Sequence, residues 1–378
     1  MKGLFWVGIL GLLLFEIANV YFIMPMPGSQ RMNSIGLAHF LYRWRWFFRI
    51  LFLLMIVAGV IRARGKRKWL LIIPLAIVGA VAYMANFVMA ADHMFYQPGK
   101  LLMASATDNK VDTGRLVIGV TLNGEARAYP IRFLGYHHQV QDSIAGQPVM
   151  ITYCTVCRTG RVYQPLVNGK YEKFRLVGMD HFNAMFEDAS TGSWWRQVTG
   201  EAVTGRLKGQ HLPQLFSTQT SLAEWLQLHP NSLIMQADSG FIKSYDTTGN
   251  FETGKSRSKL TGTDSISWKD KSWVVGVKAG NSKKVYDWNQ LKRARIIQDK
   301  VEGTPVLLVL SNDNKSFFAF ERPGHDIQFT LENDTLNANN RHYRIDGTGI
   351  DTSFSLKPLP ASQEFWHSWR TFYPDTKK

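Results

Sequence analysis

Three long apolar runs dominate the first part of the chain, at 3–24, 47–61 and 69–91. Roughly 20 apolar residues cross the hydrocarbon core of a bilayer, so the first and third runs are long enough by themselves. The second run is long enough if it begins near Trp44. Residues 1–91 are therefore predicted to form a transmembrane region with three helices, at about 3–24, 44–61 and 69–91.

From residue 92 onward the pattern is different. Short runs of β-branched and aliphatic residues alternate with Gly, Asn, Asp and Pro, which is typical of β-strands. Four such runs are 116–120, 149–153, 273–277 and 306–310. The stretches 222–228 and 364–372 are followed by a proline and are predicted as short helices. The expected fold class of this region is mainly β (α+β).

An internal repeat is found when the chain is shifted by 157 residues. Ten of the 33 positions from 117 to 149 then match an identical residue, and both copies end in a Trp followed five residues later by a Pro. The repeat predicts two duplicated β-rich units. The first covers 92–249, a polar linker covers 250–270, and the second, degenerate unit covers 271–378.

The repeat also separates scaffold from candidate chemistry. Residues that both copies keep are expected to be scaffold, whereas residues that one copy has alone are candidates for a site. Four such residues of the first copy are Cys154, Cys157, His137 and His138, which correspond to Ser311, Asn314, Ala294 and Arg295. The candidate site is therefore predicted to lie in the first copy.

The net charge of +15 first suggests a nucleic-acid partner, but its distribution points elsewhere. Residues 1–91 carry ten Lys and Arg against one acid, Glu16, which leaves a charge of +6 for the rest of the chain. Basic residues beside apolar segments are typical of membrane topology, and the chain shows no basic stripe suited to a phosphate backbone. We expect the lipid bilayer as a partner and no nucleic acid. Glu16 is also a candidate to pair with Arg49 of the second span.

The densest basic cluster, 62–68, predicts the orientation of the chain. Such clusters stay in the cytoplasm, so three spans place the N-terminus inside and residues 92–378 outside. The expected location is the cytoplasmic (inner) membrane, with a multi-pass anchor and an extracytoplasmic region. Arg31 and Arg43 lie in a loop that this orientation places outside, and they disagree with the rule.

The only two cysteines form the motif Cys154-Thr155-Val156-Cys157. In an exported domain such a pair is a dithiol that exchanges electrons, half of a metal site or a structural disulfide. An apolar strand precedes the pair, and β-like residues follow Arg158 and Gly160. The pattern predicts strand, turn, strand, and a turn with two thiolates has the geometry of a metal knuckle.

The leading hypothesis is a membrane-anchored protein with a Cys₂His site for a transition metal such as Zn or Cu. Its ligands would be Cys154, Cys157 and His137. Neighbouring residues on a strand face opposite ways, so only one of His137 and His138 can point at the thiols. His138 and His181 are further possible ligands.

Two alternatives stay open. In the first, the protein is a thiol–disulfide oxidoreductase in which Cys154 attacks, Cys157 resolves and Arg158 stabilises a thiolate. In the second, it is a partner-binding or carbohydrate-binding module with a structural disulfide, which its Trp-rich motifs permit. The sequence does not identify a protein or small-molecule partner, and it leaves open whether the protein is an enzyme.

From about Asp92 to Pro374 the chain resembles the bacterial and archaeal domain-of-unknown-function family 3179, a family of exported or membrane-tethered proteins with a C-x-x-C motif. The resemblance rests on motifs at 127–130, 136–137, 152–157, 187–197, 200–201, 365–369 and 373–375. In the family pattern an acid commonly follows the residue aligned with His137, where this chain has His138. The resemblance implies the domain and no reaction, and the three predicted spans lie outside it.

Overall fold

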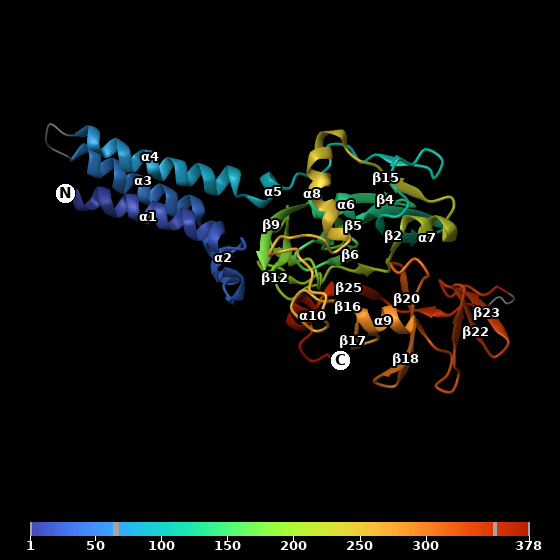
Figure 1. Cartoon of the computed structure of the whole chain (residues 1–378). Coiled ribbons are helices and arrows are strands. Elements are labelled where there is room, and N and C mark those ends of the chain that lie inside the picture. The colour runs from blue at the N-terminus through green and yellow to red at the C-terminus, as the bar shows by residue number, and fades with distance from the viewer. Residues whose placement is uncertain (1, 63–67, 351–353, 377–378) are drawn as a thin grey trace. The chain divides into compact units, whose positions relative to one another are not determined.

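The computed structural model of the chain describes residues 2–62, 68–350 and 354–376. The chain divides into two compact units, whose elements are labelled in Figure 1. The N-terminal unit combines 1–96 with 172–196 and 201–211, and the C-terminal unit combines 97–171 with 197–200 and 212–378. Among the described residues there are ten α-helices and seven β-sheets, so the expected mainly β (α+β) class is confirmed for the chain beyond its N-terminal helices.

Apolar helices form the first part of the N-terminal unit. The helices α3 (Arg45–Ile61) and α4 (Ile72–Tyr83) both pack against α1 (Lys2–Tyr21), as Figure 1 shows. Their shared core contains Phe5, Ile9, Leu12, Ile56 and Val78. The shorter helical elements are η1 (Ser29–Arg31), α2 (Ile35–Arg43), η2 (Lys68–Leu71), η3 (Met84–Val88) and α5 (Ala91–Met94).

The prediction of three membrane spans is supported for one helix. Among the described residues, only Gly3–Tyr21 is long and apolar enough to cross a membrane by itself. The helices α2 and α3 pass the same test only as a pair, and they are bent by 62°. The third apolar stretch, Ile72–Val88, is shorter. Residues 63–67 of the basic cluster lie outside the described residues.

A polar link joins these helices. Arg49 of α3 donates to both carboxylate oxygens of Glu16 in α1, at 2.6 and 2.9 Å, so the pair suggested by the sequence forms. Asn86 of η3 completes the link, because its amide accepts from Arg49 at 2.7 Å and donates to Glu16 at 2.8 Å. The three polar side chains therefore form hydrogen bonds with one another within an apolar bundle.

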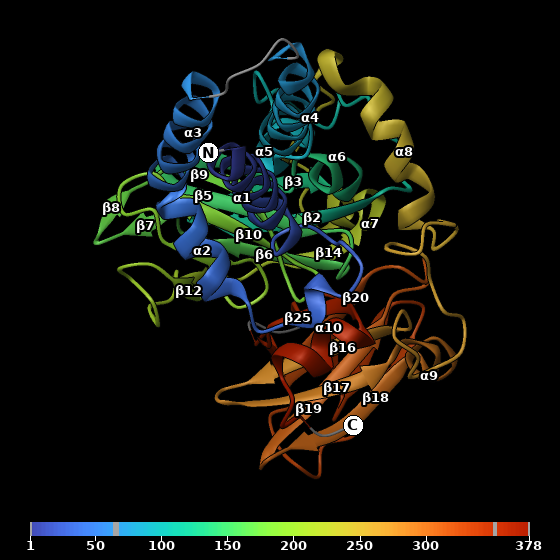
Figure 2. The same ribbon diagram turned by 90° about the vertical axis from the view of Figure 1, so that its left-hand side faces the viewer.

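The N-terminal unit also contains a four-stranded antiparallel sheet, with the order β12-β11-β10-β9. Its strands are β9 (Phe174–Asp180), β10 (Asn183–Asp188), β11 (Trp194–Arg196) and β12 (Ala202–Thr204). Helix α2 lies against this sheet, as Figure 2 shows, with Ala38 packed among Val177, Met185, Trp194 and Val203.

The first half of the C-terminal unit contains three sheets, in the orders β1-β15-β3-β2-β14, β13-β6-β5-β4 and β7-β8. Its strands are β1 (Met103–Ala104), β2 (Leu116–Leu122), β3 (Glu125–Pro130), β4 (Gln139–Ile144), β5 (Gln147–Cys154), β6 (Thr159–Tyr163), β7 (Leu166–Val167), β8 (Lys170–Tyr171), β13 (Gln214–Leu215), β14 (Thr218–Ser221) and β15 (Leu233–Met235). Its helices are α6 (Ile131–His137), α7 (Leu222–Leu228), η4 (Ser239–Phe241) and α8 (Ile242–Glu252).

The second half contains three further sheets, in the orders β17-β16-β25, β18-β19-β20-β24 and β21-β22-β23. Its strands are β16 (Trp273–Ala279), β17 (Ser282–Asp287), β18 (Ile296–Val301), β19 (Thr304–Leu310), β20 (Phe317–Glu321), β21 (Thr330–Glu332), β22 (Thr335–Ala338), β23 (Arg341–Arg344), β24 (Lys357–Pro358) and β25 (Ala361–Phe365). Its helices are α9 (Trp288–Ala294) and α10 (Trp366–Phe372), the latter beside β16 and β25 (Figure 2).

The two halves share an order of elements: hairpin, short helix, three antiparallel strands, and later a strand that leads into a short helix. The helices α6 and α9 both end at a residue with positive φ, His138 at 63° and Arg295 at 65°. In each half the Trp ring of a short helix that follows a strand, α7 or α10, occupies the space above a strand glycine, Trp225 at Gly119 and Trp369 at Gly276.

Candidate functional site

The two cysteines lie at one end of a buried hairpin in the C-terminal unit. Cys154 is the last residue of β5, and Cys157 lies in the turn that leads to β6. The strands pair with Cys154 opposite Thr159. The two cysteines form no disulfide in the structure, and both are fully buried. The strand, turn and strand predicted around the pair are confirmed.

Lys271 brings an ammonium group to this turn. Its Nζ donates to the carbonyl oxygens of Val156, at 2.8 Å, and Leu260, at 2.5 Å. It also lies 3.2 Å from Nε2 of His367. The two carbonyl oxygens accept from a protonated lysine, the imidazole nitrogen can accept in one tautomer, and the ring of Phe365 faces the same nitrogen at 4.6 Å. These contacts hold a positive charge beside the cysteine turn.

The charge of Lys271 is coupled to the thiols. Burial lowers the pKa of Lys271, and the sulfur atoms of Cys157 and Cys154 act in the opposite direction because a thiolate stabilises the ammonium. An attraction between opposite charges is mutual. The ammonium therefore stabilises a thiolate at the pair, which is the reactive form of a cysteine.

His367 lies beside Lys271 and contacts the same carbonyl group of the turn. Its Nε2 lies 3.0 Å from the Val156 oxygen, so this nitrogen donates to Val156 or accepts from Lys271 according to its tautomer. Burial, aided by the charge of Lys271, lowers the pKa of His367 to about 4. The imidazole is therefore neutral at pH 7. In addition, the backbone N–H of Phe365 donates to the Cys157 oxygen at 2.9 Å, so β25 fixes the turn.

Arg158 follows the pair directly and is fully buried, with a φ of 55°. Its guanidinium donates to Gln363 at 2.8 Å and to the backbone oxygens of Phe251 and Glu252 at 3.1 and 3.0 Å. It also lies 3.6 Å from the ring centre of Trp273. Burial lowers the pKa of Arg158. The contacts of this cation tie the turn to the end of α8 and to β25.

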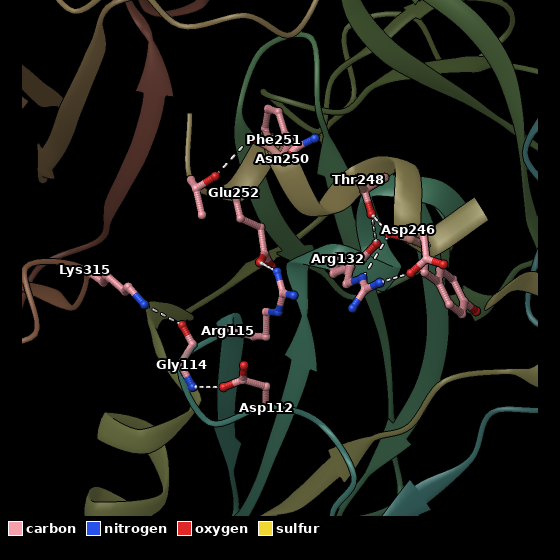
Figure 3. A network of polar contacts seen from close by, with 12 residues as sticks. Asp112, Gly114, Arg115, Arg132, Asp246, Thr248, Asn250, Phe251, Glu252 and Lys315 are labelled. Carbon is pink, nitrogen blue, oxygen red and sulfur yellow. Dashed lines mark hydrogen bonds and ion pairs between the residues drawn. The ribbon is translucent and has the colours of Figure 1, made fainter. Parts of the chain in front are cut away.

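Figure 3 shows the polar network around the end of α8. The Glu252 carboxylate turns toward Arg115, whose Nη1 donates to Oε2 at 3.1 Å. Arg132 of α6 pairs with Asp246 of α8 in the same view. Thr248 donates to the Arg132 oxygen at 2.8 Å. These contacts fasten α8 against α6 and so hold the two carbonyl groups that receive Arg158.

The predicted histidine ligands have other surroundings. His137 ends α6, is fully buried, and has its Nε2 2.7 Å from the hydroxyl of Tyr245. The Nδ1 of His138 lies 3.2 Å from the Tyr136 oxygen, and burial, followed by the neighbouring His137, lowers the pKa of His138 to about 4. His181 belongs to the N-terminal unit and contacts Asp180 at 2.6 Å.

No group of three or more His, Cys, Asp and Glu side chains with the spacing of a metal site occurs among the described residues. The structure thus groups Cys154 and Cys157 with Lys271 and His367. The Cys₂His set of Cys154, Cys157 and His137 stays a prediction.

The comparison with known families decides the classification of the chain. A family model described as "Protein of unknown function (DUF3179)" matches residues 98–376. The chain belongs to the DUF3179 family. No curated protein and no solved structure matches it. The DUF3179 domain contains the cysteine turn, Lys271 and His367, whereas the apolar N-terminal helices precede it.

Sequence reasoning missed Lys271 and His367 because it looked for the site within one copy. In the DUF3179 domain both residues lie at or beyond the start of the second copy, more than 100 residues after the cysteines. His367 had a signal, since it belongs to the motif Phe365-Trp-His-Ser-Trp369 on which the resemblance rested. Lys271 stands in a polar stretch without a motif.

Proposed function

We propose that the DUF3179 region is a thiol–disulfide oxidoreductase whose redox pair is Cys154 and Cys157. The partly buried ammonium of Lys271 carries this proposal, because it donates to the oxygen of Val156 between the two cysteines and interacts electrostatically with both sulfur atoms. A cation beside a C-x-x-C pair lowers the free energy of the thiolate, which is the nucleophile of thiol–disulfide exchange.

The reaction begins when one thiol of the pair loses its proton. The resulting thiolate attacks a sulfur of a substrate disulfide, forms a mixed disulfide and expels the other substrate sulfur as a thiolate. The second cysteine then attacks the mixed disulfide and releases the remaining substrate thiol. The pair is oxidised to one disulfide, and the substrate gains two electrons and two protons. The proton of the first thiol passes to solvent or to the departing substrate thiolate.

Both thiols are fully buried, so exchange with a protein substrate requires the turn to become accessible. The segment 253–272 contains Leu260 and Lys271, which are held together by the hydrogen bond from Nζ to the Leu260 oxygen. We propose that displacement of this segment exposes the pair.

A trapping experiment tests the redox proposal. The reduced full chain in detergent is mixed with glutathione disulfide, and the products are identified by mass spectrometry. If Cys154 attacks and Cys157 resolves, Cys157→Ser retains one glutathione, Cys154→Ser retains none, and the wild type forms an internal disulfide. A wild-type pair that stays reduced over hours in the presence of a large excess of glutathione disulfide would refute the proposal.

The second copy offers a matched control. Ser311 and Asn314 of the second copy occupy the positions that correspond to the two cysteines. Lys271, in contrast, is aligned with Gly114 of the first copy, so the second turn has no lysine equivalent to Lys271. In a chain without Cys154 and Cys157, the double substitution Ser311→Cys/Asn314→Cys places the motif on the corresponding turn. We expect it to react with glutathione disulfide at least tenfold more slowly than the native pair at pH 7.

The metal-binding hypothesis remains a prediction, and the same protein tests it through its metal content. If the protein contains about one transition metal per chain and Cys154→Ser does not, the metal-binding hypothesis replaces the redox proposal. The binding-module alternative would require a Cys154–Cys157 disulfide that resists reduction.

We also propose the finer membrane topology, with three spans, the N-terminus inside and residues 92–378 outside. Support comes from the packing of α3 and α4 against α1, the link of Glu16, Arg49 and Asn86, and the exposed apolar side chains of the bundle, such as Leu14, Leu54 and Ile72. The shared order of elements in the two halves supports the proposed duplication.

A further inference from the structure

Three arginines surround one polar cavity of the N-terminal unit. Arg43 is the last residue of α2, Arg45 is the first of α3, and Arg206 follows β12. The cavity has a volume of about 420 Å³ and is also lined by Tyr42, Glu187 and the loop 189–192. Cationic side chains far apart in the sequence thus meet in one place.

The positive charge of this cavity is not neutralised by its own walls. In the described part of the chain, no carboxylate forms an ion pair with any of the three arginines. The acid in the wall, Glu187, is already engaged by Arg175 at 2.9 Å and by the indole N–H of Trp194 at 2.7 Å. The cavity therefore favours an anion.

One of the arginines is held in place. Arg45 donates to the Tyr42 oxygen at 2.7 Å, and its guanidinium lies 3.9 Å above the Tyr42 ring. Arg43 and Arg206 are exposed. The site thus combines one fixed cation with two that can adjust to a ligand.

Exposed aromatic side chains flank the cavity along the chain. Trp44, Trp46 and Phe47 stand next to Arg43 and Arg45, and each is more than half exposed. Trp residues beside Arg at the end of an apolar helix are typical of the level of the lipid headgroups. An anion at that level is most often a lipid phosphate.

We propose that this cavity binds the phosphate group of an anionic phospholipid at the extracytoplasmic membrane surface. The proposal rests on the topology proposed above and is independent of the redox chemistry. Guanidinium groups donate pairs of N–H bonds to phosphate oxygens, which matches the three arginines. The site also gives a reason for Arg43 to lie in a loop where the positive-inside rule disfavours it.

The test measures lipid binding by the full chain in nanodiscs. Nanodiscs of phosphatidylcholine are titrated with phosphatidylglycerol, and the protein-bound lipid is counted by native mass spectrometry after gentle release. The variants are Arg43→Gln/Arg206→Gln, the charge-preserving Arg43→Lys/Arg206→Lys, and Arg31→Gln as a control, since Arg31 lies outside this cavity. A parallel arm adds inorganic phosphate.

We expect the wild type and Arg31→Gln to retain phosphatidylglycerol equally. The double Gln variant should bind it at least tenfold more weakly, because each arginine contributes roughly fivefold, and the Lys variant should keep part of the affinity. Equal binding by all four proteins would overturn the proposal. Full competition by millimolar inorganic phosphate would also overturn it, since the site would then be one for a soluble anion.

This test separates the inference from the topology on which it rests. Both faces of a nanodisc are open, so a chain with the opposite orientation would still bind the lipid. The orientation is measured separately, by the accessibility of a tag after residue 378 in intact cells. Melting temperature and gel filtration show whether each variant is folded.

Discussion

Lys271 is the cation whose side chain lies against the backbone between the two cysteines. The carbonyl oxygens of Val156 and Leu260, with the Phe365 ring, hold its amine in a partly buried place, and burial lowers its pKa against the effect of the two sulfur atoms. The arrangement costs desolvation free energy and is most favourable when a thiolate is present. The arrangement is what the proposal of reactive cysteines requires.

Substitution of Lys271 by Met keeps most of the side-chain volume and removes the charge. We expect alkylation of the cysteine pair by iodoacetamide at pH 7 to slow by roughly fivefold to tenfold, because a smaller fraction of the pair is thiolate. The pH profile of the alkylation rate should move to higher pH. Lys269→Met is the control, since Lys269 is exposed and two residues away, and its profile should be that of the wild type.

His367 gives a prediction about acid stability. Its pKa is about 4 in the folded protein, from burial and the charge of Lys271, and about 6.5 in the unfolded chain. Between these values the unfolded chain binds the extra proton, so the free energy of unfolding falls as the pH drops from 6.5 toward 4. The full effect is about 3 kcal/mol.

Urea unfolding of the full chain at pH 7 and pH 4.5 measures this effect. Between pH 7 and pH 4.5 the free energy of unfolding should fall less in His367→Gln than in the wild type. The variant should still lose the part that comes from His138, whose pKa burial also lowers to about 4. An identical pH dependence in the wild type and His367→Gln would contradict the buried, neutral imidazole.

At the scale of elements, the hydrophobic pattern was a good guide. The runs at 116–120, 149–153, 273–277 and 306–310 lie in β2, β5, β16 and β19, and the stretch 222–228 is α7. Strands buried on both faces have continuous apolar runs, which are easy to recognise. Helix α8 was missed, because 242–252 is polar and lacks helical periodicity. Its position depends on tertiary contacts such as Arg132–Asp246.

A matched pair of glycines tests the common architecture of the two halves. A Cβ at Gly119 would lie 2.1 Å from the Trp225 ring, and one at Gly276 would lie 1.8 Å from the Trp369 ring. We expect Gly119→Ala and Gly276→Ala each to lower the free energy of unfolding by about 1–3 kcal/mol through overpacking. Gly249→Ala, in α8 with ordinary contacts, should be neutral or slightly stabilising. Thermal unfolding would contradict this account if all three variants melted alike.

At the scale of the whole molecule, the candidate site draws on both halves of the C-terminal unit. The first half supplies the cysteines, and residues from Lys271 onward supply the ammonium, the imidazole and the strand that fixes the turn. The difference between the two halves of the sequence singled out the cysteines, since the corresponding residues of the second half are Ser311 and Asn314. It did not locate their partners, because a comparison of aligned positions says nothing about contacts between copies.

The measurement that tests the central claim most directly is a redox titration of the purified full chain, made without chelator in glutathione buffers, with thiols and metals counted in each sample. We predict two thiols that convert reversibly to one disulfide, without a bound transition metal. The potential should lie between roughly −120 and −300 mV, where exchange with other proteins is possible. A metal near one equivalent per chain bound by the thiols, or a pair that cannot be cycled, would contradict the account.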